Sequence, residues 1–170
     1  MERVGLTLSR LPSDTYVFVD SNIFLYVFFK HSVYGDSCRE FLKRIESGEI
    51  LGFIDEFVQN EVFHKLMVAA VVSRKRLSLP DAVSYIKRNP DILKTVPELW
   101  QACELLKSMD LEVIPGPLFG ESLVLSEEFQ LLATDAIHVA AMQKAGIENI
   151  ASNDSDYLRV KSFRVWRPMH

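Results

Sequence analysis

The sequence predicts an α/β fold, with a mostly parallel central sheet of about five strands and helices on both faces. Three observations support this fold class. Short β-branched and aromatic segments alternate with longer amphipathic segments, proline or glycine separates many of them, and no internal repeat or linker divides the chain. A helix between two strands carries the chain back to the same end of the sheet, so the two strands are parallel. Such crossover connections are right-handed. With 170 residues, we expect one compact domain over residues 1–170.

The first half of the chain begins with a strand at residues 16–19, which are all aromatic or β-branched. In residues 36–45 the apolar side chains recur at helical spacing, which predicts a helix that ends near Gly48. Residues 50–54 predict a second strand. Residues 55 to about 73 predict a long helix, because their apolar residues recur four positions apart.

An extra helical region at about 75–110 holds two helices with clear starts. Ser78 and Thr95 each stand three residues before an acidic residue, the spacing of a capping box, and a proline lies inside each first turn. The first helix should end before Asn89, because Pro90 follows it. The second should reach about Met109.

The C-terminal part returns to alternating elements. Pro115, Gly116 and Pro117 break the chain, Thr134 can cap a helix, and Gly146 can end that helix in a left-handed conformation. The predicted elements here are strands at 111–114, 149–151 and 163–166 and helices at 126–132 and 135–144.

Composition limits the classes of function. The chain is 48% hydrophobic and 25% charged, as in ordinary globular proteins, and its net charge of −4 argues against a simple nucleic-acid-binding module. A nuclease stays possible, because bound divalent cations reverse the sign of an acidic pocket. No signal peptide is visible, the apolar segment 16–29 is too short to span a bilayer, and Cys38 and Cys103 read as reduced thiols. We therefore expect a cytoplasmic protein without membrane association.

Three aspartates occupy informative positions. Asp20 and Asp154 follow the strands predicted at 16–19 and 149–151, and Asp135 opens a helix. Open α/β sheets bind ligands just outside the carboxyl ends of their strands. Each acid also has a structural explanation, because a strand-end aspartate can cap the next turn and a first-turn aspartate is stabilised by the helix dipole.

Together these acids predict a metal site. Carboxylate oxygens suit Mg²⁺ or Mn²⁺, and one or two such ions can promote phosphodiester cleavage by water. No cluster of histidine and cysteine at ligand spacing points to zinc. Asp156 is a weaker candidate, since it can simply start the turn before Tyr157. Glu61, inside the helix at 55–73, would by itself be read as a solvated surface residue.

Four motifs follow one another in order over nearly the whole chain: Val17-Phe18-Val19-Asp20-Ser21-Asn22, Asn60-Glu61-Val62, the stretch from Asp135 to Ala141, and Ser152-Asn153-Asp154-Ser155-Asp156-Tyr157. These motifs resemble those of the PIN domain family, named for the PilT N-terminus. The resemblance implies a Rossmann-like three-layer fold and a VapC-like, metal-dependent ribonuclease that cleaves single-stranded RNA. It implies either a toxin of a toxin–antitoxin pair or an RNA-processing enzyme.

The resemblance also implies roles for particular residues. The acids implied to hold Mg²⁺ or Mn²⁺ are Asp20, Glu61, Asp135 and Asp154. Asn22 and Ser152 would orient them, with Asp156 as an auxiliary ligand. A homodimer and a small antitoxin protein are the implied partners. Glu61 and Asp135 are farther apart than in compact toxin members, so the helical region between them is a candidate lid, dimer surface or RNA guide.

Several other features have two interpretations. His138, three residues after Asp135, can reach the site or be a hydrogen-bonded core residue, and its apolar neighbours favour the core. Residues 23–29 are apolar enough for core or for a partner interface. The basic residues that RNA phosphates could contact, although solvated surface is the default for them, are Arg74, Lys75, Arg76, Lys161 and Arg164.

Two rival functions follow from the same residues. A phosphohydrolase could use Asp20 as its nucleophile, but such enzymes usually need a second aspartate two residues later, where this chain has Asn22. A catalytically silent PIN-like protein could keep the acids and serve as a scaffold or an RNA-binding partner.

Overall fold

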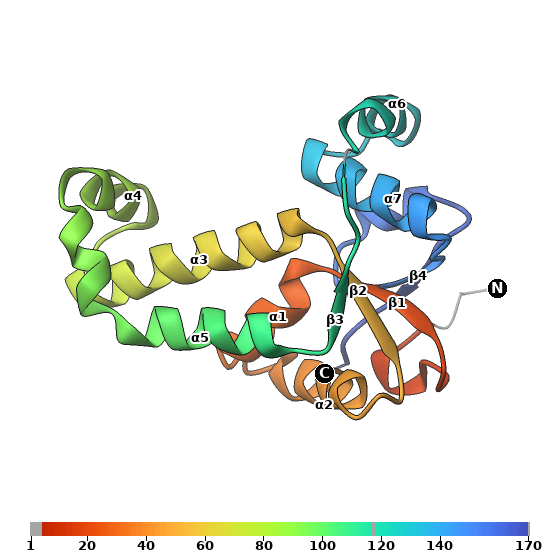
Figure 1. Ribbon diagram of the computed structural model, residues 1–170, viewed down its shortest axis with the longest axis horizontal. Helices are drawn as coiled ribbons and strands as arrows, with labels where there is room; N and C mark the ends of the chain where they lie inside the picture. Colours follow the sequence, from red (N-terminus) through yellow and green to blue (C-terminus); the bar gives the residue numbers. More distant parts are fainter. Residues whose placement is uncertain (1–4, 117, 170) are drawn as a thin grey trace. The chain divides into compact units, whose positions relative to one another are not determined.

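The computed structural model describes residues 5–116 and 118–169, and it divides into two compact units (Figure 1). The first unit consists of the described parts of Met1–Gln59 and Asp110–His170, and the second is Asn60–Met109. The expected break at Pro117 lies outside the described residues. That the chain acts as a single domain stays a prediction.

A five-stranded, all-parallel sheet forms the centre of the first unit, in the order β3-β2-β1-β4-β5. This sheet confirms the predicted fold class. Each strand lies within two residues of its predicted bounds. The strands are β1 Tyr16–Val19, β2 Leu51–Ile54, β3 Leu111–Val113, β4 Asn149–Ala151 and β5 Arg164–Trp166.

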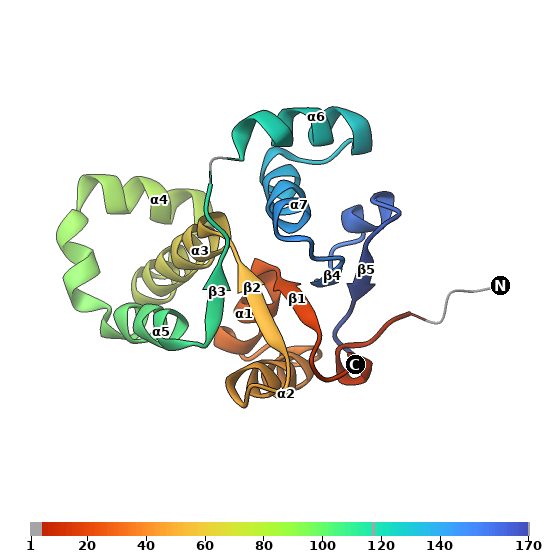
Figure 2. The same ribbon diagram turned by 45° about the vertical axis from the view of Figure 1, so that its right-hand side comes forward.

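Helices cover both faces of this sheet. The helices of the first unit are α1 Ser21–Phe28, α2 Gly35–Glu46, α6 Phe119–Phe129 and α7 Ala133–Ala145, with short 3₁₀ helices at Leu8–Arg10 and Asp156–Arg159. The chain passes from β1 to β2 in one direction across the sheet and from β3 to β4 in the other. Right-handed crossovers then place α1 and α2 on one face and α6 and α7 on the opposite face (Figure 2).

Packing around two neighbouring positions of the sheet shows the same layering. A Cβ atom added to Gly52 of β2 would come within 2.9 Å of Ile45 Cδ1 in α2, so a larger residue here would force the Ile45 side chain to shift. The ring of Phe18 in β1 instead lies 5.3 Å from the ring of His138 in α7. Val17 pairs with Gly52, and successive residues of a strand point to opposite faces. The sheet is therefore held between α2 and α7.

The second unit is helical. It contains most of α3 Glu56–Lys75, then α4 Leu79–Arg88, a 3₁₀ helix Pro90–Thr95 and α5 Pro97–Ser108. Its core packs Val68 and Val71 of α3 against Ala82 and Ile92. Ser78 caps α4 by accepting a hydrogen bond from the Asp81 N–H at 3.3 Å, as its spacing predicts.

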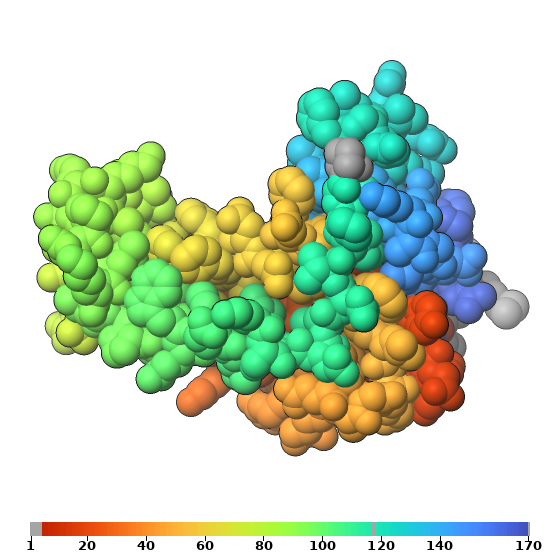
Figure 3. All heavy atoms as spheres, viewed as in Figure 1, coloured from red at the N-terminus to blue at the C-terminus, as the bar shows by residue number. Residues whose placement is uncertain are grey.

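Three local predictions are wrong. The Thr95 hydroxyl donates to the Ile92 carbonyl at 2.8 Å and does not cap α5. Thr134 lies inside the first turn of α7, which begins at Ala133. The helix predicted at 126–132 begins seven residues earlier, at Phe119, and ends at Gln130 in the left-handed region. Helix α6 contributes to the surface of the first unit (Figure 3) and exposes 70% of Phe119.

The remaining elements match their sequence signals. Gly146 ends α7 with a positive φ of 68°. Ile23 and Phe24 of α1 are fully buried, which supports the core interpretation of that segment, although Phe29 is half exposed.

Cys38 and Cys103 are free thiols, and burial raises the pKa of Cys38 to about 12. None of the helices in the described part of the chain is long and apolar enough to cross a membrane.

Candidate active site

The candidate site lies in the first unit, where the carboxyl ends of β1 and β4 meet. The connections that leave these neighbouring strands run in opposite directions across the sheet, which makes this edge a topological switch point. Asp20 directly follows β1, and Ser152 and Asp154 follow β4. The Asp20 N–H donates to the Ala151 carbonyl at 3.0 Å, so the two strand ends stay paired up to the site.

Asp20 is both a helix cap and the best-held carboxylate of the site. Its side chain caps α1, because Oδ1 accepts a hydrogen bond from the Ser21 N–H at 2.7 Å. Its Oδ2 accepts hydrogen bonds from Asn22 Nδ2 at 2.6 Å and Ser152 Oγ at 2.5 Å. Asp20 is only 6% exposed. Three donors therefore hold this buried carboxylate in one orientation.

Asn22 and Ser152 connect the two strand ends. Asn22 Nδ2 donates to Ser152 Oγ at 3.1 Å, and Asn22 Oδ1 accepts from the Asn153 N–H at 3.2 Å. Ser152 Oγ in turn accepts from the Asp154 N–H at 3.0 Å. The two side chains implied to support the acids therefore contact Asp20 directly and fix the backbone that leads to Asp154.

Asp135, Asp154 and Asp156 form the acidic cluster of the site. Each offers a carboxylate oxygen that lies within 4.8 Å of the others, which is close enough to share one cation. Asp154 Oδ1 accepts from the Asp156 N–H at 2.8 Å, and Asp156 also pairs with Arg159 at 2.9 Å. An all-oxygen donor set that is partly buried fits a hard divalent cation such as Mg²⁺ or Mn²⁺.

The pKa of Asp135 shows the electrostatic strain in the cluster. Burial raises its pKa, and the charges of Asp154 and Asp20 raise it further, while a hydrogen bond from Tyr157 lowers it. The Tyr157 hydroxyl donates to Asp135 Oδ1 at 3.2 Å. Burial and the nearby aspartates raise the pKa of Tyr157, so its hydroxyl stays protonated and remains a donor. A bound cation would relieve the repulsion among these acids.

We expect Tyr157→Phe to move the acid limit of Mn²⁺ binding to higher pH. The ionised form of Asp135 is the form that binds a cation, so affinity falls as pH decreases through the pKa of Asp135. Losing the tyrosine hydrogen bond raises that pKa further. Loss of one hydrogen bond should also lower the free energy of unfolding by about 0.5–1.5 kcal/mol. Calorimetric Mn²⁺ titrations from about pH 5 to about pH 8 measure the shift.

Tyr16→Phe is the matched control for this prediction, because Tyr16 is half exposed at the amino end of β1. It should leave the pH dependence of Mn²⁺ binding unchanged. An equal pH dependence in the wild type and Tyr157→Phe would show that the Tyr157 hydroxyl does not tune Asp135.

A buried pair of Asp55 and His138 lies behind the site. His138 Nδ1 is 2.7 Å from Asp55 Oδ2, and both side chains are 1% exposed. Burial lowers the pKa of His138, but the hydrogen bond to Asp55 and the charges of Asp55, Asp20 and Asp135 outweigh it, and the pKa is raised overall. Asp55 directly follows β2. The strand-end signal that singled out Asp20 and Asp154 applies equally to Asp55, which sequence reasoning read only as a helix start.

His138 also offers a nitrogen to the edge of the site. One of its ring nitrogens lies within 4.8 Å of a carboxylate oxygen of Asp20. Its Nε2 is buried and has no hydrogen-bond partner among the residues that the structure describes. The sequence favoured a satisfied core histidine. The structure buries His138 as expected, yet only one of its nitrogens is satisfied.

Glu61 and the basic residues stay predictions. Glu61 lies in α3, within the second unit, where its carboxylate pairs with Lys65 at 2.6 Å. Arg74 and Lys75 end α3, and Arg76 follows with a φ of 55°.

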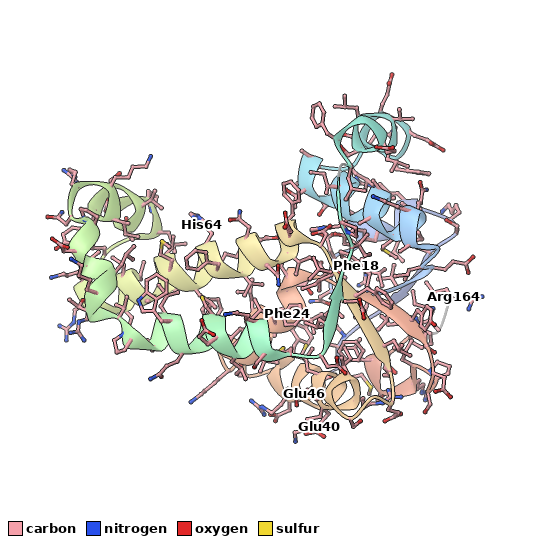
Figure 4. The ribbon with its side chains drawn as sticks, in the orientation of Figure 1. Phe18, Phe24, Glu40, Glu46, His64 and Arg164 are labelled. Atoms are coloured by element: carbon pink, nitrogen blue, oxygen red, sulfur yellow. The ribbon has the colours of Figure 1, made fainter. Side chains whose placement is uncertain are left out.

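In the first unit, Lys161 lies in the turn before β5, and Arg164 begins that strand. Both side chains are exposed, and Arg164 extends away from the sheet (Figure 4). These positions leave both residues open to RNA and equally consistent with solvated surface.

Fold and site together define a class of protein: a parallel α/β protein that gathers carboxylates at the switch point of its sheet. The model of the PIN domain matches residues 17–162. The chain belongs to the PIN domain family.

Several known proteins are similar to this chain. Ribonuclease VapC2 of Methanocaldococcus jannaschii is 26% identical over 149 residues, which cover 88% of this chain and 91% of that protein. The structure of VapBC2 from Rickettsia felis bound to a DNA fragment from its promoter is similar to this chain, with a TM-score of 0.59 and 14% sequence identity. The similarity covers 91% of this chain and 99% of the chain in that structure. A toxin–antitoxin complex from Klebsiella pneumoniae has a TM-score of 0.53 at 17% identity, over 86% and 94%. The solved structures establish the fold, and the family and the named relative support a nuclease.

Proposed function

We propose that this protein is a Mg²⁺- or Mn²⁺-dependent endoribonuclease that cleaves single-stranded RNA. The observation that carries the proposal is the meeting of Asp20 with the acidic cluster of Asp135, Asp154 and Asp156 at one sheet edge. Membership of the PIN domain family and similarity to a protein named ribonuclease VapC2 support the nuclease assignment.

In this proposal the acids of the site hold the metal, and two polar side chains support them. The acids that would hold one or two ions are Asp20, Glu61, Asp135 and Asp154, with Asp156 as an auxiliary ligand. When bound, such an ion supplies water activation and stabilises negative charge on the phosphodiester. Asn22 and Ser152 keep Asp20 oriented through their hydrogen bonds to Oδ2. Burial and the charges of Asp154 and Asp20 raise the pKa of Asp135, so this acid loses its charge at a higher pH than an ordinary aspartate.

The contacts of Asp20 disfavour a phosphohydrolase in which this residue is the nucleophile. Both of its oxygens accept hydrogen bonds, and the position two residues later is Asn22, which donates to it. Three hydrogen bonds therefore occupy both oxygens of this carboxylate and fix its orientation, which disfavours attack on phosphorus.

The test is an RNA cleavage assay with the purified protein. We expect unstructured RNA to be cleaved in Mn²⁺ or Mg²⁺, EDTA to stop cleavage, and added Mn²⁺ to restore it. Cleavage that persists in EDTA would overturn the metal site. Phosphatase activity without RNA cleavage would favour the nucleophile mechanism, and RNA binding without cleavage would favour the scaffold.

A protein partner is also part of the proposal. One of the similar solved structures is a toxin–antitoxin complex, which supports a small antitoxin as a partner of this chain. We further propose a homodimer. Light scattering on the purified protein, with and without the product of a neighbouring small gene, measures both assemblies.

A further inference from the structure

Three aromatic rings gather directly after α1, outside the acidic site. Tyr26, in α1, lies with its ring centre 4.7 Å from that of His31 and 5.1 Å from that of Tyr34. His31 and Tyr34 stack on each other at 5.1 Å, with only 13° between their planes. We call Tyr26, His31 and Tyr34 the aromatic cluster.

Hydrogen bonds hold the aromatic cluster in one conformation. His31 Nδ1 accepts from the backbone N–H groups of Val33 and Tyr34, both at 3.2 Å. Because Nδ1 is an acceptor, the proton of the neutral ring is on Nε2. The His31 N–H donates to the Tyr26 carbonyl at 2.9 Å. A Cβ atom on Gly35 would approach that carbonyl to 3.2 Å, so glycine suits this tight turn.

A chain of hydrogen bonds ties the cluster to the candidate active site. The Tyr26 hydroxyl accepts from Asn153 Nδ2 at 3.0 Å. The Asn153 N–H donates to Asn22 Oδ1, and Asn22 Nδ2 donates to Asp20 Oδ2. Two side chains therefore separate the cluster from Asp20, and the strand ends that position the acids also position the rings.

The cluster is placed at the surface rather than in the core. His31 is exposed and Tyr34 is half-buried, and the exposed Lys30 adjoins them. Lys30 adopts a positive φ of 51°, a conformation that non-glycine residues rarely take. Fixed, stacked rings that reach solvent are suited to bind a flat ligand, and a cation beside them is suited to a phosphate.

We propose that the exposed His31 ring, stacked on Tyr34, is a stacking site for one unpaired nucleobase of the RNA substrate. The proposal rests on the proposed ribonuclease function. The base extends the existing stack, His31 Nε2–H donates a hydrogen bond to the base or its phosphate, and Lys30 contacts the backbone. A base in a duplex has no free face for this stack, so the site selects single-stranded RNA.

The test uses single-stranded RNA oligonucleotides that each carry one 2-aminopurine, placed at successive positions. Binding is followed by fluorescence in EDTA, and kcat and KM are measured in Mn²⁺. We expect quenching at one position only, because stacking quenches this base. Tyr34→Ala and His31→Ala should remove the quenching and weaken RNA binding by at least about fivefold, the effect of losing one stacked base. KM should rise, with kcat nearly unchanged.

Two variants serve as controls. Tyr34→Phe keeps a stacking ring and should bind RNA like the wild type. Tyr16→Ala removes a half-exposed aromatic from the amino end of β1, opposite the site, and should change nothing. Melting temperatures show whether each variant folds. If Tyr34→Ala does not fold, His31→Ala still tests the proposal.

The possible failures are distinguishable. If the wild type cleaves RNA but His31→Ala and Tyr34→Ala leave quenching and KM unchanged, the stacking site is wrong and the ribonuclease stands. If RNA is bound with position-specific quenching that Tyr34→Ala removes, but is never cleaved, the stacking site stands and the ribonuclease is wrong. Equal quenching with duplex RNA would overturn selection for an unpaired base.

Discussion

Replacing Asp20 with asparagine is expected to reduce metal-dependent RNA cleavage by more than about 100-fold, since loss of a residue that merely supports a metal ligand already costs about 10–100-fold. The substitution removes the negative charge and leaves an amide in contact with Asn22 and Ser152, which both donate to Oδ2 in the wild type. The remaining oxygen can still cap α1, because asparagine and aspartate are equally good at this position. The new NH2 group faces these two donors, so the free energy of unfolding should also fall by about 1–3 kcal/mol, and melting temperatures show whether the variant is folded in the assay.

Initial rates with a short unstructured RNA, together with calorimetric Mn²⁺ titration, measure this effect. Asp36→Asn is the matched control, because Asp36 is an exposed first-turn acid of α2 that forms an ion pair with Arg39. It should keep wild-type rates. If Asp20→Asn cleaved RNA at the wild-type rate while folded, Asp20 would be a helix cap and nothing more.

Strand-end acids were predictable because their signal is local. A run such as Val17-Phe18-Val19 marks a buried strand, and a charged residue placed directly after it must be capped, paired or bound. The same reasoning identifies Asp154 and, read consistently, Asp55. The order of the strands, which places β1 beside β4 and brings Asp20 and Asp154 to neighbouring positions, was not predicted, because the alternation of strands and helices indicates parallel strands but not their order.

Contacts between distant segments were not predictable in the same way. Asp55 and His138 are joined through the packing of α7 on the sheet, and nothing near either residue in sequence indicates the other. The Thr95 hydroxyl donates to the Ile92 carbonyl and does not cap α5, and the spacing in the sequence does not distinguish these two outcomes. The early start of α6 was hidden by the glycines and prolines at 115–120, which indicate a loop.

The second large effect concerns stability, and it tests the buried pair of Asp55 and His138. We expect Asp55→Ala to lower the free energy of unfolding of the first unit by about 3–5 kcal/mol, the typical result of removing one partner from a buried ion pair. The substitution leaves His138 Nδ1 without its partner. It also removes the cap on α3, because Asp55 Oδ1 accepts from the Val58 N–H at 3.0 Å. Asp55→Asn keeps one oxygen that can accept from the Val58 N–H, and its NH2 can donate to Nδ1 of a neutral His138, so it should cost less.

Guanidinium unfolding followed through Trp166 fluorescence in a Trp100→Phe background isolates the first unit, because Trp100 lies in the second unit and the chain has two tryptophans. Glu56→Ala is the control: this exposed neighbour contributes only its charge near the start of α3, worth about 0.3–1 kcal/mol.

The pH dependence of this stability has a definite sign. The pKa of His138 is raised in the folded protein, so the pair stabilises fully below the unfolded pKa of about 6.5, and the stabilisation is lost as pH rises through the folded pKa. Asp55→Ala should flatten this dependence. If Asp55→Ala were as stable as Glu56→Ala at every pH, the pair of Asp55 and His138 would contribute no net stability. Some buried ion pairs behave in this way, because the cost of removing their charges from water offsets their attraction.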